Sequence, residues 1–542
     1  MVKQRLTYQS RAVSHVRVPL MHRRRTVVAS VMMAFALLAA LSPALPVTDT
    51  AMPRGRLTVA NARETRAMAN AGVFPSPGRS GASMTTADGA PIGMELRTLP
   101  DWFSLDSGVL NGIASQAGEL RQLDCETVPV HLMNRDELRE MLVQDSEEDL
   151  NEIDATQELL ILLDLLDEGQ NLRDIMVEAY TQDVLGFYDA DKDELYVVSE
   201  TGDLGPLDRL TLAHEYAHAI QDQHFDLTSL GGQNDDSEAS SALDALIEGD
   251  ATVVQALYFW SYLDPGEQAA IGEMTAEPGK EPGAGVPPVI QQTMMFPYQY
   301  GLVFVMALIE EGKWKAVNDA YGDPPKSTEQ IMHPEKYIEN RDDPLAVTLP
   351  DMAAALRHGW SELDSDVFGE FSLKLYLEAF LDSSEAETAA AGWGGDRYTF
   401  LEDDAGAKVF VLSTEWDTES DAEEFYQACV DRAHEKGGSG KRGNAEGSKA
   451  SARWESEGLS YRFALDGERV HLVIAPDAKT AKKAMAAASG SAKSSNVWLY
   501  VGVGVGLACL VCVLGFVVLL VRRRRNMRLA AESAVSQGGP SP

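Results

Sequence analysis

The residues in this sequence best able to do chemistry are two histidines and a glutamate in an H-E-x-x-H stretch, His214, Glu215 and His218. On a helix, positions four apart lie on the same face, so both imidazoles would point at one place. Imidazole nitrogen is a favoured zinc ligand, and Glu215 would lie beside it, able to take a proton from a zinc-activated water. The alternative is a chance match, with ordinary core or surface histidines. Pro206 and the apolar stripe that follows it favour a helix here.

A catalytic zinc site needs a third protein ligand, and two residues are candidates for that role. His224 stands where metzincins carry their third histidine, but that motif needs a glycine at the position of Gln221. We therefore interpret His224 as a residue at the end of the helix. Glu248 is the stronger candidate, because it lies in Ile-Glu-Gly-Asp-Ala on the next predicted helix.

Three elements in sequence order resemble the gluzincin zinc peptidases, above all their aminopeptidase-N-like branch. H-E-x-x-H is followed by Glu248-Gly-Asp-Ala and then by Pro297-Tyr-Gln-Tyr-Gly, and the resemblance covers roughly residues 180–320. The stretch H-E-x-x-H-A-x-Q-D-Q is also similar to stretches of uncharacterised, membrane-bound bacterial proteins. The resemblance implies a zinc peptidase in which His214, His218 and Glu248 bind one zinc ion.

The same resemblance implies roles for further side chains. Glu215 would be the general base and then the acid that protonates the leaving amine. Tyr298 would donate a hydrogen bond to the tetrahedral oxyanion, with Tyr300 and then His333 as alternatives. Each of these three also has an ordinary interpretation, as a core tyrosine or a loop histidine. The aminopeptidase branch carries a G-x-M-E-N stretch before its zinc helix, and the absence of that stretch here leaves endo- and exopeptidase activity open.

Several acids lie near the motif. Asp222 and Asp244 are candidates for holding the ligand histidines in one tautomer, although solvated surface acids are commoner. Before the zinc helix, an acidic turn joins two predicted strands of a β-hairpin, and Leu195–Val198 could pair with an extended peptide substrate. The turn has the spacing of a calcium loop, but Glu194 replaces the required glycine. We interpret it as a solvated turn containing Asp189, Asp191, Asp193 and Glu200.

Both ends of the chain carry targeting patterns. A basic start, a short apolar run and Ser-Pro-Ala predict a signal peptide or N-terminal anchor over residues 1–44, and a flexible linker follows over 45–95. Residues 497–521 hold no charge and precede four arginines, which predicts a transmembrane helix and a basic cytoplasmic tail over 522–542. We therefore expect a single-pass protein of the cell membrane whose body lies outside. Both ends of the chain are basic, so that body is more acidic than the net charge of −37 for the whole chain, which argues against nucleic-acid binding.

The middle of the chain divides into two predicted domains. Residues 96–340 are predicted to form a mainly helical, gluzincin-like zinc peptidase domain with a small β-hairpin, and residues 341–490 an α+β module. The predicted fold class is therefore α+β with one C-terminal transmembrane helix. Cys125 and Cys429, one in each domain, would form a disulfide or stay as free thiols.

Together these patterns predict a membrane-anchored, extracytoplasmic zinc metallopeptidase acting on a peptide or protein substrate. The alternative is a non-catalytic sensor or scaffold at the cell surface on a zincin-like fold. Glu215 favours the enzyme, because a purely structural zinc has no use for a base beside its ligand. The sequence predicts neither the natural substrate nor the oligomeric state.

Overall fold

The computed structural model describes residues 27–31, 107–148, 150–199, 204–232, 236–275, 285–357, 359–442 and 449–490. By its contacts the chain divides into two compact units, Met1–Ala488 and Ser489–Pro542. Both predicted domains, up to Ala488, fall in the first unit, so the boundary predicted at residue 340 does not separate two units.

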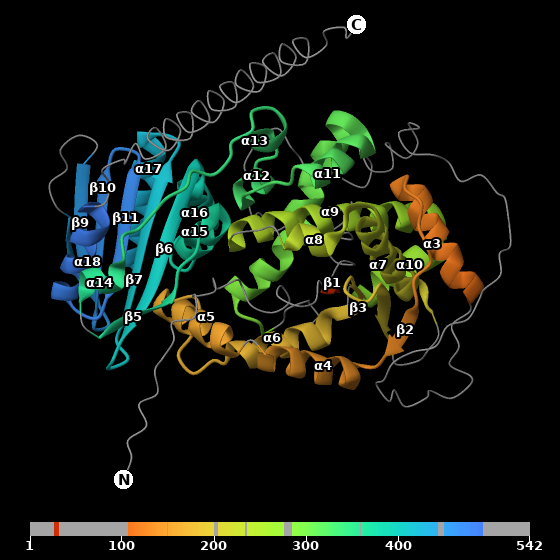
Figure 1. Ribbon diagram of the computed structural model, residues 1–542, viewed down its shortest axis with the longest axis horizontal. Coiled ribbons are helices and arrows are strands. Elements are labelled where there is room, and N and C mark those ends of the chain that lie inside the picture. Colours follow the sequence, from red (N-terminus) through yellow and green to blue (C-terminus); the bar gives the residue numbers. More distant parts are fainter. Residues whose placement is uncertain are drawn as a thin grey trace, which may run out of the picture. The chain divides into compact units, whose positions relative to one another are not determined.

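Two long helices, α7 (Pro206–Phe225) and α9 (Ser237–Tyr262), lie at the centre of the predicted peptidase region (Figure 1). Pro206 stands in the first turn of α7, where Asp208 accepts a hydrogen bond from the N-cap N–H at 2.7 Å. Asp236 caps α9 in a similar way, accepting from a backbone N–H at 2.8 Å. Most positions of both helices are buried, as expected of helices covered by other elements on several sides.

Other helices surround this pair. α11 packs along α9 and breaks at Gly312 and Lys313, where Lys313 has a positive φ of 57°. The apolar side chains of α3, α7, α9 and α11 form most of one large core. The bounds of the surrounding helices are α3 (Ser107–Arg121), α4 (Arg135–Glu148), α5 (Leu150–Leu162), α6 (Leu172–Asp183), α8 (Leu227–Gly231), α10 (Pro265–Thr275) and α11 (Pro288–Gly322).

A four-stranded sheet with strand order β1-β3-β4-β2 lies against α7. β3 and β4 form the antiparallel hairpin that the sequence predicts, and β2 joins β4 in parallel. β1 lies inside the segment that the sequence predicts to be a signal peptide, and it pairs antiparallel with β3. The signal peptide itself stays a prediction. The strands are β1 (Val27–Val31), β2 (Val130–Met133), β3 (Val184–Asp189) and β4 (Glu194–Val198).

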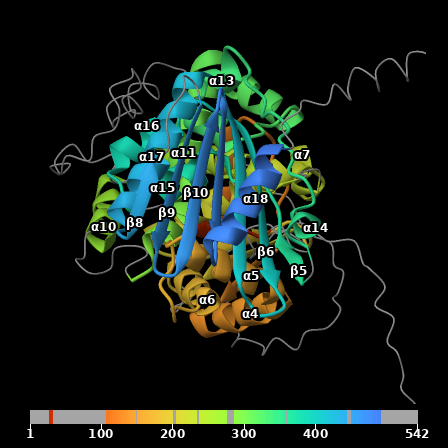
Figure 2. The same ribbon diagram turned by 90° about the vertical axis from the view of Figure 1, so that its left-hand side faces the viewer.

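A seven-stranded antiparallel sheet of order β5-β6-β7-β11-β10-β9-β8 organises the C-terminal part. Helices α17 and α18 lie on opposite faces of this sheet (Figure 2). Alternate side chains of the strands pack on α17 at one face and on α18 at the other. The α+β character of this module is therefore confirmed. Its elements are α14 (Met352–Leu356), β5 (Trp360–Asp364), α15 (Gly369–Glu378), α16 (Ser383–Ala390), β6 (Trp393–Asp403), β7 (Lys408–Trp416), α17 (Glu419–Glu435), β8 (Ser439–Arg442), β9 (Lys449–Ser456), β10 (Leu459–Asp466), β11 (Arg469–Ala475) and α18 (Ala478–Gly490).

The end of α5 belongs to the core of the C-terminal module. Arg432 of α17 is buried, and its guanidinium donates to the carbonyl oxygens of Leu163 at 2.5 Å and Tyr376 at 2.7 Å. Lys436 forms an ion pair with Asp164 at 2.5 Å, next to the same turn. Leucines near the end of α5 lie in the apolar cluster of the seven-stranded sheet. Part of the predicted peptidase domain is therefore an integral piece of the C-terminal core.

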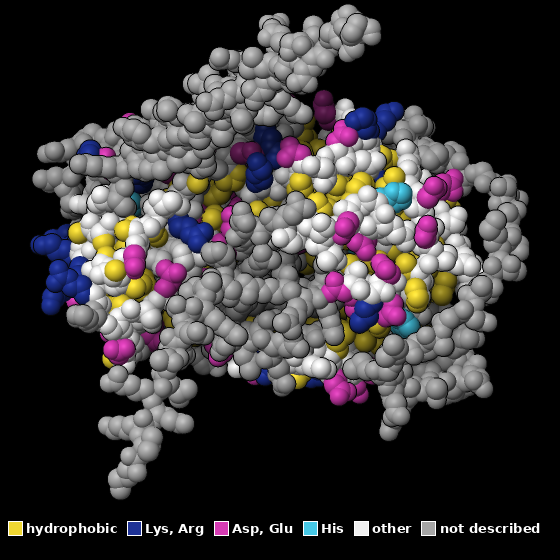
Figure 3. Space-filling view, viewed as in Figure 1, with side chains coloured by type: hydrophobic (Ala, Val, Ile, Leu, Met, Phe, Trp, Pro, Cys, Tyr) yellow, Lys and Arg dark blue, Asp and Glu magenta, His cyan; other side chains and the backbone are white. Residues whose placement is uncertain are grey.

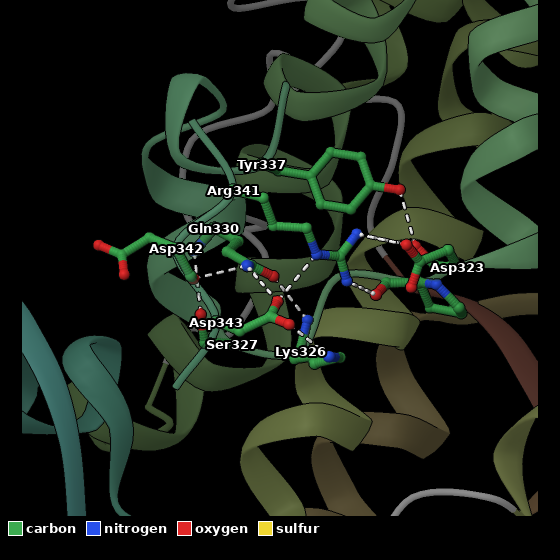
Figure 4. Close-up of polar contacts among 9 residues, drawn as sticks. Asp323, Lys326, Ser327, Gln330, Tyr337, Arg341, Asp342 and Asp343 are labelled. Carbon is green, nitrogen blue, oxygen red and sulfur yellow. Dashed lines mark hydrogen bonds and ion pairs between the residues drawn. The ribbon is translucent and has the colours of Figure 1, made fainter. Parts of the chain in front are cut away.

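The connection between α11 and the C-terminal module is fixed by a polar network around Arg341 (Figure 4). Its guanidinium donates to the carbonyl of Pro324 at 3.0 Å and pairs with Asp323 at 3.0 Å and Asp343 at 2.8 Å. It also lies 4.8 Å from the ring centroid of Tyr337. Two short helices, α12 (Thr328–Met332) and α13 (Glu335–Ile338), lie within this connection. Hydrogen bonds from side chains to the backbone hold the connection in place, so it is an ordered segment.

The predicted fold class is corrected on one point. It contained a transmembrane helix over residues 497–521, yet no helix within the described ranges is long and apolar enough to cross a membrane. The longest of them, α11, carries Glu310, Glu311 and Lys313 and breaks at the lysine. For the described residues the fold class is α+β without a membrane-spanning helix. The segment 497–521 itself lies outside the described residues, and the localisation stays a prediction.

The disulfide considered from the sequence is not formed. Cys125 and Cys429 are both free, and they pack in two different apolar clusters. Burial raises the pKa of Cys125 to about 11 and that of Cys429 further, so both stay protonated thiols at neutral pH.

Acidic side chains lie inside the molecule as well as on its surface. Figure 3 shows Asp and Glu side chains on both halves of the visible face, with more of them on the right, in keeping with the net charge of −37. Within the C-terminal module, Asp364 and Asp396 are 3% and 2% exposed. Burial raises the pKa of Asp364 to about 7, against the opposing hydrogen bond from the Tyr398 hydroxyl, and raises the pKa of Asp396 to about 6.

We expect the free energy of unfolding to fall as the pH rises from about 4 to about 7. In this range the folded protein keeps a proton on Asp364 that the unfolded chain, with a pKa of about 3.9, has already released. One such group contributes at most about 1.4 kcal/mol per pH unit. Asp364→Asn keeps an acceptor for Tyr398 and should flatten the curve, measured by urea unfolding at several pH values. The exposed control Asp404→Asn should not, and equal slopes in wild type and Asp364→Asn would contradict this account.

Candidate metal centre

Three side chains converge on one buried point between α7 and α9. The Nε2 atoms of His214 and His218 lie 3.0 Å apart, and Glu248 Oε2 lies 3.2 Å from the first and 3.5 Å from the second. Both histidines are 0% exposed and Glu248 is 6% exposed. Among the described residues this is one of two groups of acids and histidines compact enough to hold a metal ion.

The local structure explains why these atoms meet. Residues 214 and 218 lie one turn apart on α7, so their imidazoles project from the same face, with ring centroids 4.6 Å apart and planes at 85°. α9 packs directly against α7 and presents Glu248 to that face. The structure brings His214, His218 and Glu248 together, while their role as zinc ligands stays a prediction.

The three residues also fit a metal ion by their charge. Burial lowers the pKa of His214, which favours the neutral imidazole. Burial alone would raise the pKa of Glu248, but the neighbouring His218 and His214 outweigh it and lower that pKa. Neutral imidazole and ionised carboxylate are the forms that bind zinc, and two histidines with a glutamate are a ligand set of catalytic zinc sites. Two imidazole nitrogens only 3.0 Å apart repel each other unless a cation or a proton lies between them.

Glu215 is buried on α7 immediately after the first ligand, next to strand β3. The contact with β3 depends on Gly186, where an added Cβ would lie 3.4 Å from Glu215 Cγ and 3.1 Å from a methyl group of Thr211. It would also lie only 2.9 Å from the carbonyl oxygen of Tyr196, so the strand has no room for a side chain at this position. Gly186 was not singled out from the sequence, although an isolated glycine in a strand is a signal of close approach.

Tyr298 lies close to the ligands, buried on α11, with its ring centroid 6.4 Å from that of His214. Two glycines bring α11 to this position. An added Cβ on Gly249 would lie 2.2 Å from the carbonyl oxygen of Gly301, and one on Gly301 would lie 2.1 Å from the carbonyl oxygen of Ala245. The backbones of α9 and α11 therefore touch beside Glu248, which explains the glycine in each of the two stretches.

The alternatives for the role of Tyr298 lie elsewhere. Tyr300 packs against Phe296 and Phe371, with ring centroids 5.2 and 6.1 Å away. His333 pairs with the buried carboxylate of Glu370 at 2.8 Å. Their ordinary interpretations, as a packed tyrosine and a hydrogen-bonded histidine, describe what the structure shows.

His224 is not brought to the metal ligands. It is exposed, and its Nε2 lies 2.8 Å from the carbonyl oxygen of Asp124. Asp222 accepts hydrogen bonds from the Tyr188 hydroxyl at 3.1 Å and the N–H of Leu227 at 2.9 Å, so it supports β3 and the end of α7 and not a ligand histidine. Because α7 continues as a regular helix as far as Phe225, His224 faces away from the ligands, as the sequence predicts.

Within the described residues, the acids of the hairpin turn are not brought together as a possible metal site. Asp189 is buried and pairs with Lys192 at 2.7 Å, so it is not solvated as the sequence suggests. Asp193 takes up the left-handed backbone conformation of the turn, with a φ of 54°. Glu200 lies outside the described residues. The remaining acids are not among the groups that could hold a metal ion in the described ranges.

The second group of acids, formed by Glu329, Asp342 and Asp417, already has its own cation. The Lys336 ammonium lies 2.6, 3.1 and 2.6 Å from these three carboxylates. Burial raises the pKa of Glu329 to about 8, although the lysine opposes this shift. We therefore interpret the group as a hydrogen-bond network around the Lys336 ammonium that joins α12 and α13 to the seven-stranded sheet.

Sequence reasoning missed two polar residues near the ligands. Tyr180 of α6 is half-buried, and its pKa rises to about 12 through burial and through the charges of Asp244 and Glu248. Gln221 is fully buried and contacts the ring of His218. Tyr180 stands far before the zinc helix in the sequence, and no local pattern links it to the site. Gln221 lies three residues after His218, so helical spacing makes their side chains neighbours, and this spacing is the signal that could have linked Gln221 to the site.

The comparisons with known proteins cover only the C-terminal module. Residues 357–485 match a family described as a domain of unknown function (DUF8575). No curated protein matches the chain, and no solved structure matches it. The matched region contains the whole seven-stranded sheet but none of the candidate metal ligands, so it carries no information on their chemistry.

We expect purified full-length protein to bind about one zinc ion per chain. Glu248→Ala should weaken zinc binding strongly, because it removes one of three converging ligands and the only charged one. His224→Ala is the control on the same helix and should leave the affinity unchanged. Competition with a chromophoric chelator measures both. Normal binding by Glu248→Ala, with loss in His224→Ala, would show that the ligand set is the metzincin one.

Proposed function

We propose that this protein is a zinc-dependent metallopeptidase that hydrolyses peptide bonds. The observation that carries the proposal is the convergence of His214, His218 and Glu248 on one buried point, with Glu215 on the same helix beside the first ligand. A zinc ion bound there would act as a Lewis acid toward the scissile carbonyl and would lower the pKa of a water molecule. The order of H-E-x-x-H, E-G-D-A and Y-x-Y-G stretches, which resembles that of gluzincins, supports the same function.

In this proposal Glu215 carries the proton. Its carboxylate accepts a proton from the attacking water as the new carbon–oxygen bond forms, and returns it to the amine nitrogen as the carbon–nitrogen bond breaks. The products are a peptide with a new carboxyl group and a peptide with a new amino group, and the carboxylate of Glu215 is restored. Burial of Glu215 between α7 and β3 supports this role, because packing there restricts the side chain to few rotamers.

Tyr298 is proposed to stabilise the oxyanion. A phenol hydroxyl that points at the developing negative charge donates a hydrogen bond that is stronger in the transition state than in the ground state. The contact of α11 with α9 at Gly249 and Gly301 supports this role, because it holds α11 close to the helix that carries Glu248 and so keeps Tyr298 near the candidate ligands.

The rival function is a non-catalytic sensor or scaffold in which the metal only stabilises the fold. Glu215→Gln separates the two, because glutamine keeps the size of glutamate but cannot accept the proton. Zinc content and thermal stability should stay close to wild type, while turnover should fall on the order of a hundredfold or more. The assay uses a pool of unfolded proteins and short peptides with free or blocked amino ends. Cleavage of blocked peptides would identify an endopeptidase.

If wild type with full zinc cuts none of these substrates, the scaffold becomes the better account. If wild type cuts and Glu215→Gln cuts equally well, the proposed mechanism is wrong.

Tyr298→Phe tests the oxyanion role, since it removes one hydroxyl and little else. We expect a loss of about a hundredfold, mostly in kcat and little in KM. Tyr300→Phe is the matched control on the same helix and should retain normal kinetics, because Tyr300 packs against phenylalanines away from the ligands. Equal losses in both variants would point to a change in α11 packing and not to a lost hydrogen bond.

A further inference from the structure

We propose that Gln221 is a positioning residue for the metal centre, which holds His218 in one tautomer and ties it to the turn that carries Glu248. The inference rests on the proposed metal site but not on peptidase activity. Gln221 is 0% exposed and touches both elements through a single amide group.

The orientation of the amide follows from its two partners. Gln221 Nε2 lies 2.9 Å from the carbonyl oxygen of Ile247, and a carbonyl only accepts hydrogen bonds. The amide NH₂ must therefore face Ile247, which leaves Gln221 Oε1 facing His218 Nδ1 at 2.8 Å. An amide oxygen also only accepts, so His218 Nδ1 must carry the proton.

The tautomer of His218 then determines what the ring presents to the ligand cluster. A neutral imidazole with its proton on Nδ1 has a bare lone pair on Nε2. That Nε2 is the atom that lies 3.0 Å from His214 and 3.5 Å from Glu248. Gln221 thus selects, before any metal binds, the form of the ring that can bind one.

The second partner gives Gln221 a further effect. Ile247 directly precedes Glu248, so the bond to its carbonyl fixes the helical turn from which the third ligand projects. One side chain therefore relates the second histidine to the carboxylate across two helices. The same residue stands where the metzincin pattern requires glycine, and it continues α7 instead of bending it.

The structure supplies a matched control for a merely structural role. Gln255 of α9 is also buried, and its Nε2 donates to the carbonyl oxygen of Leu210 on α7 at 3.4 Å. It bridges the same two helices at the other end of their contact, and no hydrogen bond links it to a metal ligand. A variant of Gln255 therefore reports what the loss of a glutamine bridge does to helix packing alone.

The experiment compares Gln221→Leu, Gln221→Glu and Gln255→Leu in the full-length chain. The first readout is the ring tautomer of His218 in metal-free protein, from the ¹⁵N shifts of selectively labelled histidine. The second is zinc affinity. Gln221→Leu should release the tautomer and weaken zinc binding by about 10- to 100-fold. Gln221→Glu should keep the Nδ1–H tautomer, because a carboxylate accepts from it, but it cannot donate to the carbonyl oxygen of Ile247, so the zinc affinity should recover only in part. Gln255→Leu should change neither readout, whatever its effect on the melting temperature.

A wild-type tautomer and wild-type affinity in Gln221→Leu would overturn the proposal. So would an equal loss of affinity in Gln255→Leu, because the effect would then come from helix packing. Failure of the proposed function is distinguishable: a wild type that binds zinc but cuts no substrate leaves the role of Gln221 intact. If wild type bound no zinc, the tautomer of the metal-free protein would still decide whether Gln221 positions His218.

Discussion

The contact between α7 and α9 governs the candidate site, because neither helix holds a complete ligand set. α7 supplies two imidazoles and the proposed base, and α9 supplies the carboxylate. The bridges from Gln221 to Ile247 and from Gln255 to Leu210 show that the helices run antiparallel, with one glutamine near each end of the contact. A shift of one helix by a single residue, about 1.5 Å along its axis, would move the carboxylate off the imidazoles. The packing of buried apolar faces prevents that shift, and Gln221 links the ends of the two helices that carry His218 and Glu248.

The third helix of the site is held by a different device. α11 approaches α9 so closely at Gly249 and Gly301 that a methyl group at either position would overlap backbone atoms. This contact is made by backbone against backbone and needs no polar bridge. It lies beside Glu248, so the same turn of α9 carries the proposed carboxylate ligand and packs against α11. The three helices therefore meet where the chemistry is proposed, and a change in the packing of any one would reach the ligands.

The sequence predicted the parts of the site that depend on local spacing. His214 and His218 are related by one helical turn, so their convergence needs nothing from the rest of the fold. Glu248 could be placed through a resemblance in the order of motifs. Gly186 and Tyr180 could not be placed, because their neighbourhood depends on how β3 and α6 dock against α7 and α9. The zinc ion and the peptidase activity remain proposals.

At the level of the fold, the sequence predicted that strands and helices alternate after residue 340. It did not predict the order of the seven strands in the sheet. The place of α5 in the C-terminal core has a consequence for synthesis of the chain. Arg432 donates a hydrogen bond to the carbonyl oxygen of Leu163, which precedes it by 269 residues in the sequence. At translation rates of about 5–20 residues per second, that separation delays the meeting by tens of seconds. During this interval the leucine face of α5 is without its final packing partners, and a polypeptide truncated before α17 would keep that face uncovered.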